Sequence, residues 1–384
     1  MAAARIHTEL TERFGIEYPI FGFTPSQHVA AAISRAGGLG VLGCVRFNDP
    51  DELDEVLEWM HENTDGKPFG VDVVMPAKIP TEGTQVDLAA MIPPEHKAFV
   101  ERVLDDLGVP ALPDGERVNA GVLGWLHSVA RSHVDVAMAH ADKYGQIKLI
   151  ANALGSPPSD VIATSHEHGV AVAALAGAKD HALHHVEAGV DIVIAQGYEG
   201  GGHTGEVTSM VLWPELVDAV GHTAPVLAAG GVGSGRQMAA AIALGAQGVW
   251  MGTYWLTAAE YQLGVPEGHE GPSTVQQALL AASSRDTVRR RIYSGKPARL
   301  LKTRWTEAWD ADGAPEPLPM PLQNILVSEA HARISASDDP GVVAMPAGQI
   351  VGRCNAITPV AELIADMVSE YEEATARMGK TLEA

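Results

Sequence analysis

The sequence contains only two cysteines, Cys44 and Cys354, among 384 residues. Two cysteines cannot build a disulfide scaffold or a cysteine-rich metal site, and their scarcity is typical of a reducing cytoplasm. Basic residues are also scarce: 26 Lys and Arg stand against 48 Asp and Glu, which gives a formal net charge of −22. A chain with this charge repels nucleic-acid backbones and anionic lipid, so we expect neither as a partner.

Long apolar runs are missing as well. No uninterrupted hydrophobic stretch is long enough to span a bilayer, and the N-terminal segment carries charges without an apolar signal core. We therefore expect a cytoplasmic protein. Hydrophobic residues nevertheless make up 46% of the chain, which is ample for a large core. The length exceeds that of most single domains but is reached by α/β barrels with insertions.

Short apolar segments alternate with helical patterns along most of the chain. This alternation predicts parallel strands joined by crossover helices. Eight such strands make a (β/α)8 TIM barrel the economical fold, covering residues 1–257 with a helical insertion at about 77–146. Residues 258–384 are expected to form additional C-terminal helices, a peripheral extension packed on the barrel. The expected strands are residues 18–21, 39–42, 69–74, 147–150, 170–175, 191–195, 225–229 and 248–251.

The stretch at residues 190–205, VDIVIAQGYEGGGHTG, has the composition of an active-site loop. The β-branched run at 192–194 predicts a strand buried on both faces, with Gln196 at its end. Three glycines at 200–202 allow the backbone a tight turn and close approach to a flat ligand. His203 follows them and can exchange a proton near neutral pH. The alternative is a tight turn with a surface histidine.

Glycines also follow the seventh and eighth expected strands. The segment AAGGVGSG at 228–235 leads directly into a helix, and Gly252 and Thr253 follow the next strand. Free backbone N–H groups at glycines and at a helix N-terminus bind anions, and this position in a barrel commonly holds phosphate. We therefore expect a phosphorylated ligand. The alternative is that these glycines only relieve packing at strand–helix corners.

Three motifs, in chain order AAAISRAGGLGVLG, AQGYEGGGHTG and AAGGVGSGRQMAAAIALGAQGVWMGT, resemble those of the nitronate monooxygenase (2-nitropropane dioxygenase) family. The resemblance runs from about residue 8 to 257 and implies an FMN-dependent (β/α)8 barrel with His203 as the catalytic residue. It places the FMN phosphate at Ala229, Gly230, Gly231, Gly252 and Thr253. It places the flavin ring at Gly22, Phe23, Thr24, Val74, Gln196 and Gly201.

The chain departs from the family pattern at two positions near the expected flavin. Phe23-Thr24-Pro25 stands where the family often has a small residue and then methionine, and Asp72 stands where it often has asparagine. Both departures bear on the substrate more than on FMN.

The resemblance implies an oxidoreductase that oxidises alkyl nitronates with O2. Two alternatives remain open: an NAD(P)H-dependent FMN reductase acting on a quinone or an enoyl thioester, and, more weakly, a phosphate-binding isomerase or aldolase. The partner is a small-molecule substrate with O2 or NAD(P)H, and the chain could form a homo-oligomer. We expect no metal site: His181, His184 and His185 have a suitable spacing, but they follow the fifth strand on an outer helix and are expected to be solvated.

Overall fold

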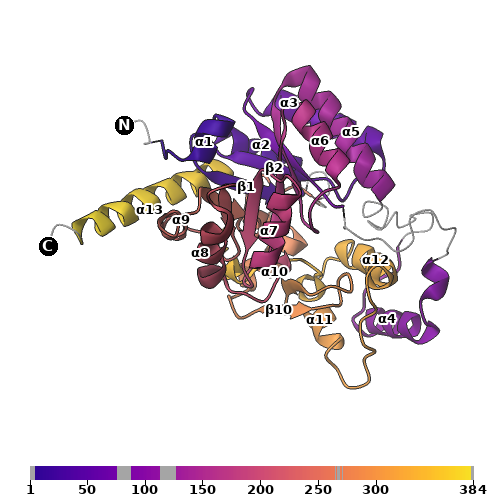
Figure 1. Cartoon of the computed structure of the whole chain (residues 1–384). Coiled ribbons are helices and arrows are strands. Elements are labelled where there is room, and N and C mark those ends of the chain that lie inside the picture. The colour runs from indigo at the N-terminus through magenta and orange to yellow at the C-terminus, as the bar shows by residue number, and fades with distance from the viewer. Residues whose placement is uncertain are drawn as a thin grey trace.

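Eight parallel strands close into a barrel in the computed structural model, which describes residues 5–75, 88–112, 127–263, 265, 269 and 271–381. The strand order around the barrel follows the chain, and the last strand pairs with the first, as Phe21 lies opposite Trp250. The expected (β/α)8 fold is confirmed (Figure 1). The barrel strands are β1 (Ile20–Thr24), β2 (Leu39–Gly43), β3 (Phe69–Val73), β4 (Ile147–Asn152), β5 (Ala171–Ala176), β6 (Ile192–Gln196), β8 (Val226–Ala229) and β9 (Gly248–Met251).

A helix crosses over between each pair of consecutive barrel strands. Short polar side chains begin several of them: Ser26, Asp49 and Ser234 each accept a hydrogen bond from a backbone N–H of the first helical turn. These caps set where each strand-to-helix loop ends, and so they define the loops at the carboxyl rim of the barrel. The crossover helices are α2 (Gln27–Arg35), α3 (Pro50–Asn63), α5 (His127–Tyr144), α6 (Ser159–Glu167), α7 (Lys179–Glu187), α8 (Ser209–Val220) and α9 (Gly235–Ala243).

Successive side chains along each strand point alternately into the barrel and out toward the helices, so the protein has an inner core and an outer core. Side chains that point inward, such as Phe21, Leu149 and Ile194, form a cluster inside the barrel, and α1 (Glu9–Phe14) adds Leu10 and Phe14 to it. Side chains that point outward pack against the crossover helices in two larger clusters. The barrel interior is therefore a packed core, which leaves the loops at its rim to carry chemistry.

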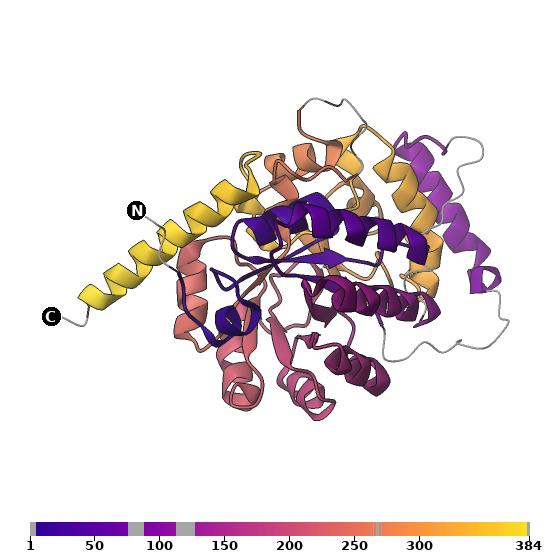
Figure 2. The same cartoon turned by 90° about the horizontal axis from the view of Figure 1, so that it is seen from above.

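The region before β4 divides between the barrel and a peripheral cluster. Helix α5 packs against α3 and β4, as a crossover helix does, whereas α4 (Pro94–Asp106) and η1 (Leu88–Met91) pack against α12 (Leu322–Ser335). Figure 2 shows α4 and α12 side by side at one edge of the barrel, with α13 (Val360–Lys380) along another side and projecting beyond it. Residues 76–87 and 113–126 of the expected insertion lie outside the described part of the chain.

The C-terminal extension contains helices, as expected, and also two strands that the sequence analysis did not predict. Strands β10 (Thr287–Arg290) and β11 (Ala298–Leu301) form an antiparallel pair, and β11 also pairs with β7 (Gly202–His203) in the loop after β6. This small sheet holds the histidine loop against the extension. The remaining elements are η3 (Thr253–Thr257), α10 (Thr274–Ala281), α11 (Arg304–Ala308), η4 (Pro340–Val342) and η5 (Gln349–Arg353). No helix among the described residues is both long enough and apolar enough to cross a membrane.

Candidate active site

The carboxyl ends of the barrel strands bring most of the expected site residues to one rim. Val71 and Val73 belong to the outer core, so Asp72 between them faces the barrel interior, as does Ala151 beside it on β4. By the same alternation Phe23 faces inward on β1, where its ring stacks on Trp250 of β9 at 6.3 Å between centroids. Phe23, Asp72 and Trp250 therefore form the floor of the rim.

Asp72 is an unusual residue for such a floor. Its side chain is only 4% exposed, and its carboxyl group makes no hydrogen bond to any residue that the structure describes. Burial raises the pKa of Asp72 well above the usual value for a carboxyl group, so the protonated form is favoured. A buried polar group without a protein partner fits a position under a polar ligand.

Two glycines after β8 form a candidate phosphate site, which we call the glycine cradle (Gly230 and Gly231). Both have positive φ angles, 92° and 73°, which strongly favour glycine. A Cβ atom on Gly230 would lie 2.9 Å from the backbone N and O of Gly197, so the close approach also demands glycine there. Within the described part of the chain, neither glycine's N–H finds an acceptor. Two free, neighbouring N–H groups fit an anionic group such as phosphate.

The helix that follows the glycine cradle does not extend it, which corrects our expectation of an open helix N-terminus. The backbone N–H of Gly235, the first residue of α9, donates to Glu370 Oε2 at 2.9 Å. The N–H of Gly233 donates to the side-chain oxygen of Gln237 at 3.0 Å. Arg353 ties this arrangement together, since it donates to Gly233 O and to Glu370 Oε1. A carboxylate from α13 thus already occupies the positive end of α9.

The other expected phosphate residues border the cradle. Ala229 ends β8 and is buried, and its carbonyl accepts from the Gly197 N–H, so it contributes position and no free donor. Gly252 leaves its surroundings open apart from Phe23. The Thr253 hydroxyl accepts a hydrogen bond from the Gly348 N–H at 2.9 Å, which leaves its proton available to donate.

The residues expected around the flavin ring serve different purposes. The α-carbon of Gly22 faces outward, because a Cβ atom there would lie 2.4 Å from Ile33 Cδ1. Thr24 is buried and its hydroxyl accepts from the Ser26 N–H, which shapes the turn into α2. Gly22 can therefore offer only backbone atoms to a ligand on the rim.

Gln196, Gly201 and Val74 shape the loops that border the rim. Gln196 Nε2 donates to Gly201 O at 3.2 Å and so fixes the glycine loop. The backbone of Gly201 also lies against Gly348 so closely that a Cβ atom would meet Gly348 N at 2.8 Å. Val74 is buried directly after β3.

His203 lies in β7, opposite Ala298 of β11. Its Nε2 atom lies 2.6 Å from the hydroxyl oxygen of Ser294, a fully buried residue in the turn between β10 and β11. Burial, together with the positive charge of nearby Lys296, lowers the pKa of His203 to about 4. The imidazole is therefore neutral at neutral pH, and it is an ordered residue of a small sheet and not a loose surface side chain.

Sequence reasoning did not find Ser294, Lys296, Gly348 or the Arg353–Glu370 pair. Ser294 lies 91 positions after His203 in the turn IYSGKP, which has turn composition but nothing that connects it to a catalytic group. His185 also differs from our expectation: it is buried, not solvated, and bridges Ser156 Oγ at 2.7 Å and Leu175 O at 3.0 Å. Its role is to tie the loop after β4 to α7.

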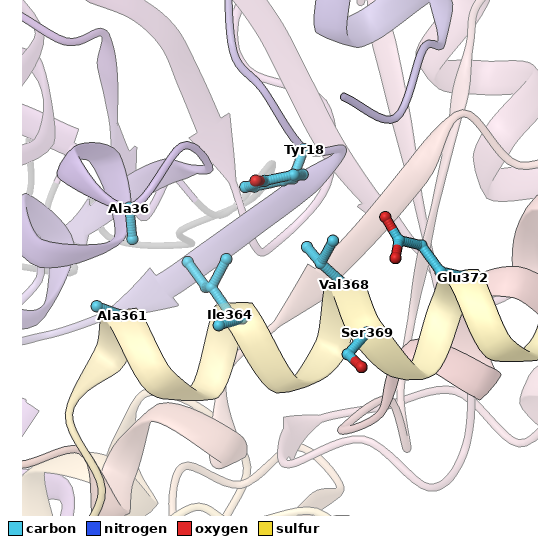
Figure 3. A pocket seen from close by; sticks show the side chains of 8 residues that line it. Tyr18, Ala36, Ala361, Ile364, Val368, Ser369 and Glu372 are labelled. Carbon is cyan, nitrogen blue, oxygen red and sulfur yellow. The ribbon is translucent and has the colours of Figure 1, made fainter. Parts of the chain in front are cut away.

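A separate cavity of about 310 Å³ lies away from this rim (Figure 3). It is lined by Tyr18, which precedes β1, by Ala36 at the end of α2, and by residues 361–372 of α13. These positions mark the amino ends of the strands, the face of a barrel that contributes to stability and not to chemistry. We assign it no part in the candidate site.

Fold and site together define a (β/α)8 barrel with a candidate anion cradle after β8 and a partly buried histidine with a lowered pKa after β6. The chain belongs to the nitronate monooxygenase family, whose model, described as "Nitronate monooxygenase", matches residues 7–370. It is therefore an enzyme of that family, an oxidoreductase.

Individual relatives agree with this placement. The chain is 46% identical over 379 residues to "Putative monooxygenase Rv1533" of Mycobacterium tuberculosis, covering 95% of this chain and 96% of that protein. It is 28% identical to "Probable nitronate monooxygenase" of Staphylococcus aureus, covering 88% and 90%. Among solved structures, nitroalkane oxidase from Streptomyces ansochromogenes superposes with a TM-score of 0.75 at 24% identity, covering 96% and 99%, a likeness of fold.

Proposed function

We propose that this protein binds FMN and oxidises alkyl nitronates with O2. The observation that carries the proposal is the pairing of a glycine cradle with free N–H groups and a partly buried histidine of lowered pKa on neighbouring loops of one rim. Family membership supplies the reaction class. Bound FMN supplies an electron acceptor for the nitronate and a donor for O2.

Each part of the rim has a task in this proposal. The N–H groups of Gly230 and Gly231 hold the phosphate, and Thr253 can add a hydroxyl donor beside them. Phe23 and Trp250 present an apolar floor, into which Asp72, whose pKa is raised by burial, places one polar group. One such cradle suits a mononucleotide, and the two G-x-G-x-x-G stretches of the chain, at 38–43 and 200–205, lie in β2 and in the histidine loop and not between an early strand and its helix.

The neutral state of His203 suits an anionic substrate. A neutral imidazole has one N–H group, and this group can donate a hydrogen bond to a nitronate oxygen. Lys296, whose side chain is exposed and whose charge acts on His203, adds positive potential on the same side. In a chain of net charge −22, such a local positive potential favours the approach of an anion.

The test has two parts. Mass spectrometry of the chromophore released by heat should give FMN; recovery of FAD, or of no flavin from a folded preparation, would rule the cofactor assignment out. The yellow protein is then mixed anaerobically, in separate reactions, with an alkyl nitronate and with NADH or NADPH. We expect rapid flavin bleaching with the nitronate. Bleaching by a nicotinamide alone would instead identify an NAD(P)H-dependent reductase.

A further inference from the structure

Asp72 finds no polar partner on the two strands that flank it. It lies opposite Gly43 on β2 and opposite Ala151 on β4, and neither of these residues has a polar side chain. All three positions face the barrel interior, because Val41 and Ala151 belong to the inner core and alternation places Gly43 on the same side. The ring of Phe23 lies over Gly43, where a Cβ atom would be 3.1 Å from it. The carboxyl group of Asp72 is therefore set in an apolar wall at the rim.

The polar groups that follow the flanking strands are engaged elsewhere. Asn152 ends β4, and its side chain exchanges hydrogen bonds with the backbone N–H and carbonyl of Met75. Cys44 follows β2, and burial raises the pKa of its thiol, so the thiol is neutral. The guanidinium of Arg46 donates to two oxygen atoms at the β1–α2 junction. None of these groups reaches the carboxyl group of Asp72.

The helices on the outer side of β3 supply no countercharge either. Val71 and Val73 point toward them, so Asp72 points away. The histidines of these helices that are not exposed have other partners, namely Trp59, Gln146, Phe47 O and Asp54 for His28, His61, His133 and His140. Burial alone accounts for the raised pKa of Asp72, so no neighbouring charge opposes it.

A buried carboxyl group in an apolar wall is most stable as the neutral acid, and its O–H group still needs an acceptor. A protonated carboxyl group has one O–H donor. Within the described part of the chain no acceptor for this proton is present. The edge of an isoalloxazine ring carries carbonyl oxygens and ring nitrogens that can accept such a hydrogen bond. The free donor and the proposed ligand are therefore complementary.

We propose that Asp72 binds the flavin ring as a neutral carboxylic acid that donates a hydrogen bond to it, so that binding of FMN is linked to the protonation of Asp72. The inference rests on the proposed function above, since it requires FMN on this rim. Asp72 is also one of the two positions at which the chain departs from the family pattern. The sequence alone pointed to the substrate there, whereas burial at the floor of the rim favours the cofactor.

A neutral donor at this position also suits the reaction class. Electrons that the ring accepts from a substrate bring negative charge to it. An O–H donor inside an apolar wall stabilises that charge, because its dipole is already oriented and water is excluded. A carboxylate in the same place would repel the charge. Asp72 therefore helps the reaction only while it keeps its proton.

The first test is the pH dependence of FMN binding. The Kd of the apoprotein for FMN is measured by fluorescence titration from pH 6 to 9 in the wild type and in Asp72→Asn. Asparagine has the same shape, and its amide donates at every pH. The ratio of the two Kd values cancels the ionisation of the FMN phosphate, which occurs at about pH 6. We expect this ratio to be constant at low pH and to rise about tenfold per pH unit above the pKa of Asp72 in the apoprotein.

Two other results of this titration are informative. If the wild type binds FMN more tightly than Asp72→Asn as the pH rises, Asp72 accepts a hydrogen bond as a carboxylate, and the proposal is wrong. If no FMN binds at any pH, the proposed function fails and this inference fails with it. Binding of FMN without a link to Asp72 overturns this inference alone.

Infrared difference spectroscopy detects the protonated carboxyl group directly and decides the case in which the ratio stays constant up to pH 9. We expect the spectrum of holoprotein minus apoprotein to contain a C=O band of a protonated carboxyl group that is lost in Asp72→Asn. Asp191→Asn is the matched control and should keep the band. Asp191 is partly buried at the amino end of β6, and its hydrogen bonds lower its pKa, so it is ionised. A constant ratio without such a band would mean that Asp72 does not bind FMN as an acid.

Asp72→Ala tests whether the side chain contacts the flavin at all. Its fold is checked by circular dichroism. Because alanine removes the donor, its Kd for FMN should exceed that of Asp72→Asn by about three- to tenfold at every pH, as expected for one hydrogen bond. Equal Kd values in the two variants would show that no hydrogen bond joins this side chain to FMN, and the proposal would be wrong.

Discussion

The glycine cradle and the histidine loop lie on the same rim but are assembled in opposite ways. Gly230 and Gly231 follow one strand directly, and their conformation depends on φ angles of 92° and 73° within one short segment. His203 depends on a serine 91 positions away and on a strand pair in the C-terminal extension. The cradle is therefore formed by residues close together in sequence, whereas the position of the histidine depends on residues far from it in sequence. Substitutions should therefore have different effects at the two places. A substitution in the glycine cradle should abolish binding of the ligand, whereas a substitution of His203 should lower only turnover.

The largest effect is expected at the cradle. Gly231→Asp adds a side chain at a φ angle of 73° and a negative charge where phosphate is held, beside Glu199. We expect a folded protein with no bound FMN and no activity, measured by absorbance and by circular dichroism. Gly66→Asp is the matched control, because Gly66 has a φ angle of 72° and lies in an open turn between α3 and β3. If both variants kept FMN, Gly231 would not hold the phosphate.

The second-largest effect is expected at His203, where two substitutions distinguish a hydrogen-bond donor from a base. Removing one preorganised donor typically costs about 10²–10³ in kcat, so His203→Ala should lose activity in that range at full flavin content. His203→Asn keeps an N–H donor and should lose less, whereas the two variants should be equally poor if the imidazole is a base.

His331→Asn is the control for the histidine variants. His331 is another partly buried histidine whose pKa is lowered by desolvation to about 4, and it lies in α12 away from the rim. That variant can lose stability, but its turnover per bound flavin should match the wild type. A drop in turnover there would show that burying any neutral histidine matters, and not His203 in particular.

How far the sequence predicts this site follows from the same contrast. The eight strands and the glycines of the cradle can be predicted, because apolar strand patterns and glycines at positive φ angles are visible in the local sequence. The N-terminus of α9 could not be predicted as closed, since Glu370 reaches it from α13. Strands β10 and β11 were missed because Arg289, Arg290 and Arg299 interrupt any alternation there. Ser294 has no local signature, since its role comes from tertiary pairing with β7.

A buried aspartate, Asp72, and a partly buried one, Asp191, allow a third prediction, in which the two pKa shifts have opposite signs. Burial alone raises the pKa of Asp72. Burial also acts on Asp191, but hydrogen bonds from Val172 N–H, Arg13 and His166 outweigh it, and the net pKa is lowered. An acid with a raised folded pKa loses stability as pH rises above its unfolded value of about 4, with a limiting slope of about 1.4 kcal/mol per pH unit. An acid with a lowered folded pKa gains stability over the range between its folded and unfolded values.

Asp72→Asn should therefore be more stable than the wild type at pH 7–8 and gain less, or nothing, near pH 4. Asp191→Asn should be less stable than the wild type at pH 7 and approach it as the pH falls below 4. Urea unfolding at matched flavin content gives both profiles. A pH-independent difference at Asp72 would mean that its carboxyl does not titrate abnormally in the folded protein.

The smallest effect concerns the border of the cradle. Glu370→Gln removes a negative charge from the N-terminus of α9 but keeps an oxygen that can accept from the Gly235 N–H. A charge at a helix terminus is typically worth about 0.3–1 kcal/mol, so the free energy of unfolding should fall by about that amount. Arg353 would lose its charged partner but keep its hydrogen bond to Gly233 O, which limits the loss.

Because this carboxylate accepts from Gly235 and not from the glycine cradle, the Kd of the Glu370→Gln variant for FMN should stay within about twofold of the wild type. If Glu370 instead bordered the phosphate, removing its charge would tighten FMN binding markedly, by more than the loss in stability. Fluorescence titration of the apoprotein with FMN distinguishes the two cases, and a Kd lowered tenfold would place the phosphate at α9 and not at Gly230 and Gly231.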